Sequence, residues 1–329
     1  LYSYLSNQLS KKFKAKIVGY FPNRAISIKK KIRNYILRLI PLNRISVYQS
    51  FGLNIILNLN DLIKLISLNK IDRTYKSIIK NISNKKIINL KIENVYLGDL
   101  LYDDYLRKCF VGRVDLNSKL FLDHLYNFVK TFYLWKYYLK KNNVKSIILS
   151  HDVYEHAIPL RIAQNSDIPV YIPDIYRLIC YDKKKKYHLD NKMYQEINSS
   201  LTKDEKINLT NFAKKKIKEK FSAKADEFVE FSEKNLVTRN IKDFLKDKKN
   251  FFSKKKINIL VACHCFYDAP HAFGKFFYDD FVDWLENLGK ISEKTDYQWF
   301  LKKHPHSLNH KLANKILGDF IIKYPKFKI

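Results

Sequence analysis

Cysteine and long apolar runs are scarce in this chain. Among 329 residues there are 4 cysteines, namely Cys109, Cys180, Cys263 and Cys265. They show no framework spacing, and a chain of this length needs no disulfides for stability, which argues against a small disulfide-stapled domain. The longest apolar neighbourhood is interrupted by charged residues well before about 18 apolar residues accumulate. We therefore expect no membrane-spanning segment and a cytoplasmic protein.

Acidic residues are also few, with 32 Asp and Glu against 62 Lys and Arg and a formal charge of +30. Such an excess attracts nucleic acid, anionic lipid headgroups or phosphorylated substrates. The excess is mostly Lys, and it accompanies abundant Asn, Ile, Tyr and Phe but only 7 Gly and 8 Pro, a bias typical of AT-rich codons. Composition alone therefore does not select a partner.

The usual phosphate and nucleophile motifs are missing as well. The sequence contains no Walker loop, no GxGxxG, no GxSxG and no protein-kinase signature. The classes of enzyme that depend on those motifs are therefore not indicated.

Strand and helix patterns alternate along the first 200 residues. Short apolar runs predict strands at 15–21, 44–52 (closed by Gly52), 85–92, 144–156 (ending in polar residues) and 168–174. Apolar residues at spacings of three and four predict helices over 117–143 and 157–167. This alternation is typical of a parallel sheet with crossover helices.

A Lys-rich helical stretch over 202–249 precedes a second strand and helix series, with strands at 257–264 and 297–305 around a helix at 276–291. We interpret the Lys-rich stretch as a solvated helical region and linker, with a nucleic-acid-binding arm as the alternative. The predicted fold is α/β, with two Rossmann-like domains in a GT-B-like arrangement and the C-terminal one truncated. The boundaries are 1–200 for the N-terminal domain, 201–255 for the linker region and 256–329 for the first half of the C-terminal domain. Because no Met opens the chain and the last domain looks incomplete, we expect a fragment.

Polar residues that follow strands are the candidates for a site, because ligands bind at the carboxyl ends of parallel strands. One group is Ser150, His151 and Asp152. Another is "KKHPH" over 302–306, where Lys and His side chains could neutralise a phosphate leaving group. A surface loop in a Lys-rich protein is the alternative explanation for this second group.

The stretch "CHCFYDAPHAFG" over 263–274 first suggests a metal site. Consecutive residues alternate across a strand and no zinc-type spacing supplies further ligands, so we expect no metal. Instead, Cys263 and Cys265 would pack inward while His264 faces a cleft, and Asp268 and His271 could act as acid or base. The alternative makes Asp268 a turn residue and His271 the first residue of a helix. The aromatic residues that follow, over 276–284, are expected in the core.

In "YLGDLLYDDYLRK" over 96–108, Asp99, Asp103 and Arg107 share one helix face. The spacing predicts an ordinary Asp103–Arg107 pair and makes Asp99 a plausible N-cap. On these residues alone, the acidic helix is structural.

Four stretches together resemble a known family. They are "GDLLYDDYLR" (98–107), "SHDVYEHAIPLRIAQNSDIPVY" (150–171), "LVACHCFYDAPHAFGKFFYDDFVDWL" (260–285) and "WFLKKHPH" (299–306). In this order they resemble bacterial surface carbohydrate and capsule polysaccharide biosynthesis proteins, related to capsule Kdo transferases with a GT-B-like fold.

The resemblance implies an acceptor-side N-terminal domain and a donor-side C-terminal domain. It places Lys303, His304, Pro305 and His306 at the donor phosphates, and His264, Asp268 and His271 in the catalytic cleft. It also suggests substrate contacts from the acceptor side, at Gly98, Asp99, Arg107, His151 and Tyr154. No metal and no cofactor is implied beyond a nucleotide-sugar donor, for which a CMP-linked acid sugar is one choice.

The function expected is therefore transfer of a sugar from a nucleotide donor to a glycan or glycolipid acceptor. The expected location is the cytoplasm, with peripheral contact to an anionic inner membrane. Two alternatives stay open: a CDP-polyol phosphotransferase of the same architecture, and a non-enzymatic basic nucleic-acid-binding protein. Aromatic residues over 121–138 and 276–284 at core spacing argue against the last, since nucleic-acid binding needs them exposed, and no specific nucleic acid is expected.

Overall fold

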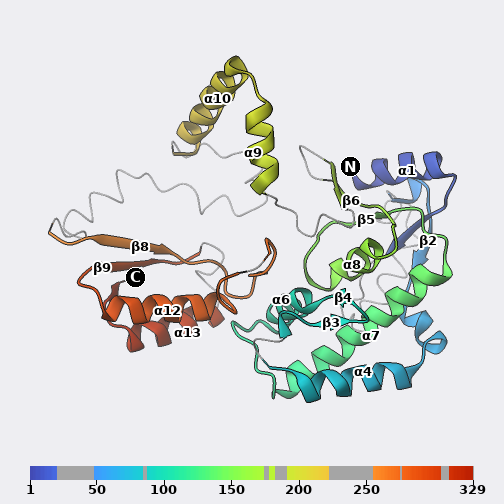
Figure 1. Ribbon diagram of the computed structural model, residues 1–329, viewed down its shortest axis with the longest axis horizontal. Coiled ribbons are helices and arrows are strands. Elements are labelled where there is room, and N and C mark those ends of the chain that lie inside the picture. The colour runs from blue at the N-terminus through green and yellow to red at the C-terminus, as the bar shows by residue number, and fades with distance from the viewer. Residues whose placement is uncertain are drawn as a thin grey trace. The chain divides into compact units, whose positions relative to one another are not determined.

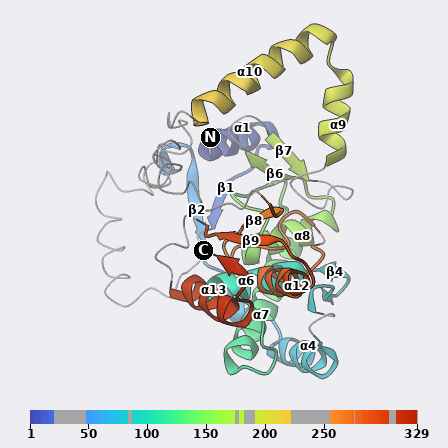
Figure 2. The ribbon, with the colours of Figure 1, turned by 90° about the vertical axis from the view of Figure 1, so that its left-hand side faces the viewer.

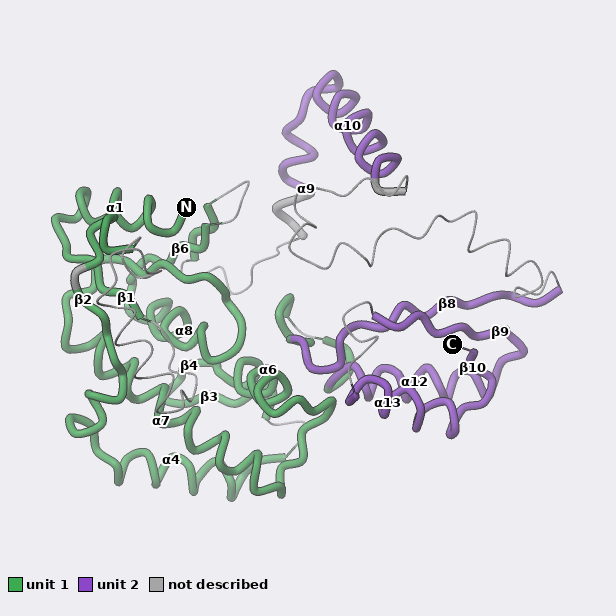
Figure 3. The backbone as a smooth tube through the Cα atoms, turned by 180° about the vertical axis from the view of Figure 1, so that it is seen from behind, with its two compact units in different colours: residues 1–188, 269–279 green, residues 189–268, 280–329 purple. Residues whose placement is uncertain are grey.

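The computed structural model describes residues 1–20, 48–83, 87–173, 178–181, 191–221, 255–274, 276–304 and 311–328. The chain divides into two compact units, and Figure 3 colours them separately. Unit 1 comprises Leu1–His188 and Ala269–Asp279, and unit 2 comprises Leu189–Asp268 and Asp280–Ile329. The segment 269–279, which the sequence assigns to the C-terminal domain, thus belongs to unit 1.

The described residues of unit 1 form three small sheets. β1 (Ile17–Tyr20) pairs in parallel with β2 (Leu53–Leu57), and β3 (Lys91–Ile92) forms an antiparallel hairpin with β4 (Val95–Tyr96). β5 (Ile147–Ile148) pairs in parallel with β6 (Val170–Pro173), while β7 (Leu178–Tyr181) joins β6 antiparallel. Mixed α/β structure is therefore confirmed.

The helices of unit 1 are α1 (Tyr2–Phe13), α4 (Leu68–Asn81), α6 (Gly98–Cys109), α7 (Lys119–Lys141) and α8 (Ile158–Gln164), with 3₁₀ turns η1 (Leu59–Leu65) and η2 (Tyr154–Ala157) (Figure 1). The helices predicted over 117–143 and 157–167 are confirmed as α7 and α8. α7 begins where the Ser118 hydroxyl accepts a hydrogen bond from the Phe121 amide at 3.2 Å, as expected of an N-cap. Its aromatic residues Phe121, Phe128 and Phe132 are buried, as predicted.

Unit 2 contains a three-stranded parallel sheet in the order β10 (Phe327–Lys328), β9 (Gln298–Lys302), β8 (Asn258–Ala262). α12 (Phe281–Glu293) and α13 (Lys311–Lys323) connect the strands and lie on the same side of the sheet (Figure 1 and Figure 2). The core between helices and strands is built from apolar residues such as Leu285, Trp299, Leu317 and Phe320. Same-sided crossovers are what right-handed connections between consecutive parallel strands produce.

Unit 2 also includes α9 (Asn191–Ser200) and α10 (Lys203–Phe221), and α10 confirms the helical pattern within the described part of the Lys-rich stretch. α10 begins at a capping box: the Glu205 carboxylate accepts from the Thr202 amide at 2.8 Å, and the Thr202 hydroxyl accepts from the Glu205 amide at 3.3 Å. None of the helices in the described ranges is long and apolar enough to cross a membrane.

The strand predicted over 144–156 is confirmed only as the short β5, because a 3₁₀ turn begins at Tyr154. Two further predicted strands are wrong in their described parts. Residues 48–52 form a helical turn, and the strand follows it as β2. Gly52, at φ 93°, therefore precedes the strand instead of closing it. In the 85–92 run only Lys91 and Ile92 pair, because Ile87 lies in a helical turn and the Leu90 carbonyl accepts from the amides of Leu97 and Gly98.

The helix predicted at 276–291 begins later, at Phe281. The Asp280 carboxylate accepts from the Asp283 amide at 2.7 Å, so the N-cap sets the start of α12. Residues 276–280 are therefore a loop, and helical spacing does not govern their burial. Phe277 is 99% exposed, which makes the prediction that the aromatic residues of 276–284 are in the core wrong for this side chain.

Candidate functional site

α6 in unit 1 carries three carboxylates into the protein interior. Asp99, Asp103 and Asp104 are only 3%, 2% and 2% exposed, and every residue from Gly98 to Leu106 is buried. A carboxylate out of contact with water is stable only when it is paired or hydrogen-bonded. Each of the three therefore has to have a partner from another element.

Asp99 pairs with Arg161 of α8. The Arg161 Nη2 atom donates to Asp99 Oδ2 at 2.7 Å, and the Leu100 amide donates to Asp99 Oδ1 at 2.8 Å. The guanidinium also lies 5.4 Å from the ring centroid of Tyr96. Burial raises the pKa of Asp99, although Arg161 opposes this. The predicted N-cap role is wrong, since the N-cap is Leu97 and the Asp99 side chain is committed to Arg161.

Asp103 pairs with His271 in the segment 269–279. Its Oδ1 accepts from Nδ1 of His271 at 2.7 Å, and its Oδ2 accepts from the His271 backbone amide at 3.1 Å. The Tyr102 ring meets the imidazole edge-on at a centroid distance of 5.2 Å. Burial raises the pKa of Asp103 to about 6, although both contacts with His271 act in the opposite direction. The carboxylate fixes the orientation of the imidazole.

The predicted Asp103–Arg107 pair is therefore wrong. Helix positions i and i+4 are neighbours on one face, but both carboxylate oxygens of Asp103 are bound to His271 of the segment 269–279. Arg107 instead lies 6.0 Å from the ring centroid of Tyr154. The interpretation of His271 as a first helix residue is also wrong, because residues 270–274 form turns.

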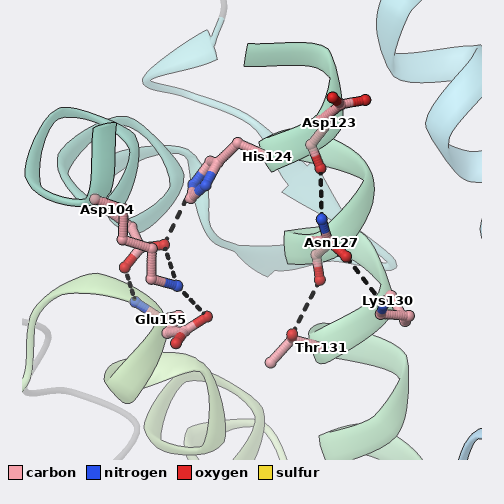
Figure 4. Close-up of polar contacts among 8 residues, drawn as sticks. Asp104, Asp123, His124, Asn127, Lys130, Thr131 and Glu155 are labelled. Atoms are coloured by element: carbon pink, nitrogen blue, oxygen red, sulfur yellow. Dashed lines mark hydrogen bonds and ion pairs between the residues drawn. The ribbon is translucent and has the colours of Figure 1, made fainter. Parts of the chain in front are cut away.

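Asp104 joins a cluster of charges at the start of η2 (Figure 4). Its Oδ2 lies 3.0 Å from Lys108 Nζ and 3.2 Å from His124 Nε2, and its Oδ1 accepts from the Glu155 amide at 3.2 Å. Lys108 also reaches Glu155, at 2.5 Å. Burial raises the pKa of Asp104, but contacts with His124 and Lys108 outweigh it, and the net pKa is lowered.

This cluster was not among the predicted sites. Asp104 and Lys108 are four residues apart on a helix, a spacing that does predict their pairing. Nothing in the sequence indicates that His124 of α7 or Glu155 of η2 would join them.

The remaining predicted residues of unit 1 are dispersed. Gly98 approaches the backbone of Ile87 and Ile88 so closely that a Cβ atom would lie 2.1 Å from the Ile87 carbonyl oxygen. It therefore has a packing role. His151 is exposed beyond β5, with Nδ1 2.9 Å from Ser150 Oγ. Of the predicted substrate residues, the structure brings together Arg107 and Tyr154.

Unit 2 has its own cluster at the carboxyl ends of two adjacent parallel strands. His264 follows β8 and His304 follows β9, and their ring centroids are 5.5 Å apart. His264 stacks on Phe281, the first residue of α12, at 4.7 Å and 27°. Lys303 Nζ donates to the Asn314 side chain at 3.2 Å. We call His264, Lys303 and His304 the basic edge of unit 2.

The residues around the basic edge follow the predicted alternation. Cys263 and Cys265 are 5% and 3% exposed, whereas His264 is an exposed residue. Burial raises the pKa of the Cys263 thiol to about 11, which makes it unreactive. Asp268 lies in a turn, where its amide donates to the Cys265 carbonyl at 3.1 Å.

The predicted catalytic group is thus divided. His271 is 3% exposed and bonded to α6 of unit 1, while His264 and Asp268 belong to unit 2. Pro305 and His306 lie outside the described residues. Within the described ranges, no group of three or more His, Cys, Asp or Glu side chains is placed to hold a metal ion.

Comparison of the chain with protein-family models, curated proteins and solved structures gives no match. The fold class is mixed α/β, with a three-stranded parallel sheet in unit 2.

Proposed function

We propose that the chain is a glycosyltransferase of bacterial surface polysaccharide biosynthesis, which moves a sugar from a nucleotide donor to a glycan or glycolipid acceptor. The observation that carries this proposal is the basic edge, where His264, His304 and Lys303 gather at the carboxyl ends of β8 and β9. Ligand phosphates favour this edge of a parallel sheet because loop amides and basic side chains converge there. Within the proposal, the two units are Rossmann-like halves of a GT-B-like enzyme.

The reaction requires stabilisation of a departing phosphate. The bond between the sugar anomeric carbon and the phosphate oxygen breaks, and a bond from the acceptor hydroxyl oxygen to that carbon forms. Lys303 and His304 would neutralise and hydrogen-bond the phosphate as negative charge builds on it. The acceptor proton passes to a base.

His264 is the best-placed candidate for that base in unit 2. It is exposed, it neighbours His304, and stacking on Phe281 fixes its ring plane. Asp268 is half-buried in the following turn and remains a second candidate. His271 is not proposed as the base, because its imidazole is buried against Asp103.

Titration of CMP into the chain tests the donor assignment directly. We expect binding that shifts the imidazole signals of His264 and His304 in NMR spectra. Lys303→Met and His304→Gln should each weaken CMP binding by about tenfold, the loss expected for one hydrogen bond to a charged group. Lys323→Met is the matched control, since it removes the same charge from an exposed residue at the last position of α13, the end of the helix that lies opposite to the carboxyl end of β9.

The same titration separates the alternatives. CDP-glycerol binding much tighter than CMP-linked sugars would favour a polyol phosphotransferase. Tight RNA binding with a steep salt dependence, unaffected by Lys303→Met, would favour a nucleic-acid-binding protein. Absence of any nucleotide binding at millimolar concentration overturns the proposal.

The proposed reaction also sets an expected location. Nucleotide sugars are cytoplasmic donors, and a net charge of +30 would hold the protein against an anionic inner membrane where glycolipid acceptors reside. Flotation with vesicles that contain phosphatidylserine should carry the protein upward at low salt. The contact is refuted if the protein stays at the bottom with anionic and neutral vesicles alike.

A further inference from the structure

Unit 1 contains a small polar cavity that the preceding assignments leave unused. Its volume is about 180 Å³. The lining side chains that matter here are Tyr20, Leu59, Asn60, Lys130, Thr131 and Glu155. Figure 4 shows three of them, Lys130 and Thr131 on α7 and Glu155 on η2.

The cavity lies where two parallel strands end. Tyr20 is the last residue of β1, and Leu59 and Asn60 follow the end of the neighbouring β2. Loops that leave the carboxyl ends of parallel strands diverge there and create room for a ligand. The topology therefore places this cavity where an α/β unit ordinarily binds small molecules.

The side chains that line the cavity offer both hydrogen-bond donors and hydrogen-bond acceptors. Lys130 Nζ donates one hydrogen bond, to Asn127 at 2.9 Å, and has further protons to give, while the Thr131 hydroxyl donates to the Asn127 carbonyl and can still accept. Within the described part of the chain, the Tyr20 hydroxyl and the Asn60 side-chain amide make no hydrogen bond. Burial and then Glu155 raise the pKa of Tyr20 to about 12, so that its hydroxyl remains a donor.

The charges in the cavity balance. Glu155 is the carboxylate of the lining, and Lys130 is its cation. Glu155 is held in place by Lys108 at 2.5 Å and by its amide contact with Asp104. An anion would meet the Glu155 carboxylate and a cation would meet Lys130, so a neutral ligand is favoured over either.

The size of the cavity and its apolar lining restrict the class of ligand further. Pockets for drug-sized ligands measure roughly 300–1,000 Å³, so this one fits a smaller molecule. The Tyr20 ring and the buried Leu59 side chain offer apolar contact. A ring with hydroxyl groups at its edge and C–H groups on its face matches both kinds of surface.

We infer that this cavity binds one neutral sugar ring, with Lys130 and Asn60 donating to its hydroxyls and Glu155 and Thr131 accepting from them. The assignment concerns unit 1 alone. It stands whether or not the basic edge of unit 2 binds a nucleotide.

Saturation-transfer NMR on the full chain tests this inference. The probes are glucose, galactose, mannose and N-acetylglucosamine, with glucuronic acid and inorganic phosphate as anionic counterparts. We expect at least one neutral sugar to bind with a dissociation constant on the order of millimolar, as suits a ligand of this size. The two anions should bind at least about tenfold more weakly, because the balanced charges of Lys130 and Glu155 give an anion no net attraction to offset the loss of its hydration.

Three variants test whether the sugar binds in this cavity. Tyr20→Phe, Lys130→Met and Thr131→Val each remove one polar group and keep most of the side-chain volume. Lys130→Met should weaken sugar binding about tenfold and the other two should weaken it several-fold. Lys140→Met is the control, because Lys140 is an exposed residue of the same helix outside the cavity lining.

Thermal unfolding confirms that each variant is folded before its affinity is compared. The inference is overturned if no neutral sugar binds, if an anion binds tighter, or if all three variants bind like the control. A failed CMP titration with successful sugar binding would reject the proposed donor site and leave this inference intact.

Discussion

Oδ1 of Asp103 lies 2.7 Å from Nδ1 of His271, a residue 168 positions later in the chain. Both side chains are almost fully buried. The contact fastens the segment 269–279 to α6, and it supplies the partner that a carboxylate in the interior requires.

Removal of this imidazole should destabilise unit 1 strongly. His271→Ala removes the imidazole that donates to the buried Asp103 carboxylate. Loss of one partner of a buried pair lowers the free energy of unfolding by about 3–5 kcal/mol. Urea denaturation, followed by hydrogen exchange of the α6 amides, measures the loss. His151→Ala is the control, because that exposed histidine should change stability by less than about 0.5 kcal/mol. Equal stability of the two variants would contradict the prediction.

Stability should also depend on pH through Asp103. Burial raises its pKa from 3.8 to about 6, so the folded state binds more protons than the unfolded state between these values. The free energy of unfolding therefore falls as the pH rises from about 4 to about 6, by roughly 3 kcal/mol, and is level above. The raised pKa of Asp99 acts in the same direction. The pKa of Asp104 is lowered, so its contribution to the free energy of unfolding is lost only as the pH falls below the range from about 4 to about 6.

Comparison with Asp103→Asn isolates that effect. The amide cannot titrate, so the variant should lack most of the decline between pH 4 and pH 6. Denaturation midpoints at closely spaced pH values give the two curves. A variant curve parallel to that of the unchanged protein would show that Asp103 is not the titrating group.

The Asp99–Arg161 pair should respond differently to single and double replacement. Arg161→Met leaves the buried Asp99 without its cation and should cost about 3–5 kcal/mol. Asp99→Leu combined with Arg161→Met removes both charges, and an apolar pair of similar volume is often neutral. We therefore expect the double variant to be more stable than Arg161→Met in urea denaturation. A double variant that is less stable than the single one would refute this account.

Gly98 should tolerate no side chain. An alanine Cβ would lie 2.1 Å from the Ile87 carbonyl oxygen and 2.4 Å from that of Ile88, and backbone atoms cannot move aside easily. Gly98→Ala should lower the free energy of unfolding by about 1–3 kcal/mol or more. At Gly318 of α13 a Cβ meets nothing within 4 Å, so Gly318→Ala should stabilise by about 0.5–1 kcal/mol. Thermal unfolding should show a lower melting temperature for Gly98→Ala and a higher one for Gly318→Ala. Shifts of the same sign in both variants would reject the prediction.

The sequence predicted those parts of the fold that local patterns determine. Alternation and helical spacing located β1, β6, β8, α7 and α8, because each of these elements buries a face set by its own residues. The start of α12 was missed because the Asp280 cap stands inside a run of aromatic residues that continues the helical pattern. The turn at 48–52 was missed because Gly52 can either close a strand or introduce one.

The site could be predicted only where topology brings residues together. His264 and His304 each follow a strand, and adjacent parallel strands end at the same edge, so their proximity follows from the strand pattern. The partners of the α6 carboxylates come from α8, η2 and the segment 269–279, which no spacing rule connects with α6. The rule for residues four apart suggested Arg107 for Asp103, and tertiary packing selected His271 instead.

The division of unit 1 between two separate stretches of chain has a consequence for its biosynthesis. The last part of unit 1, residues 269–279, leaves the ribosome after about eighty further residues that belong to unit 2 have been made. Until then, nascent α6 has Asp103 but no His271. Unit 1 can therefore complete its interior only after residues 189–268 have been made, and a ribosome stalled before residue 271 would hold an N-terminal region in which the buried Asp103 still lacks its partner.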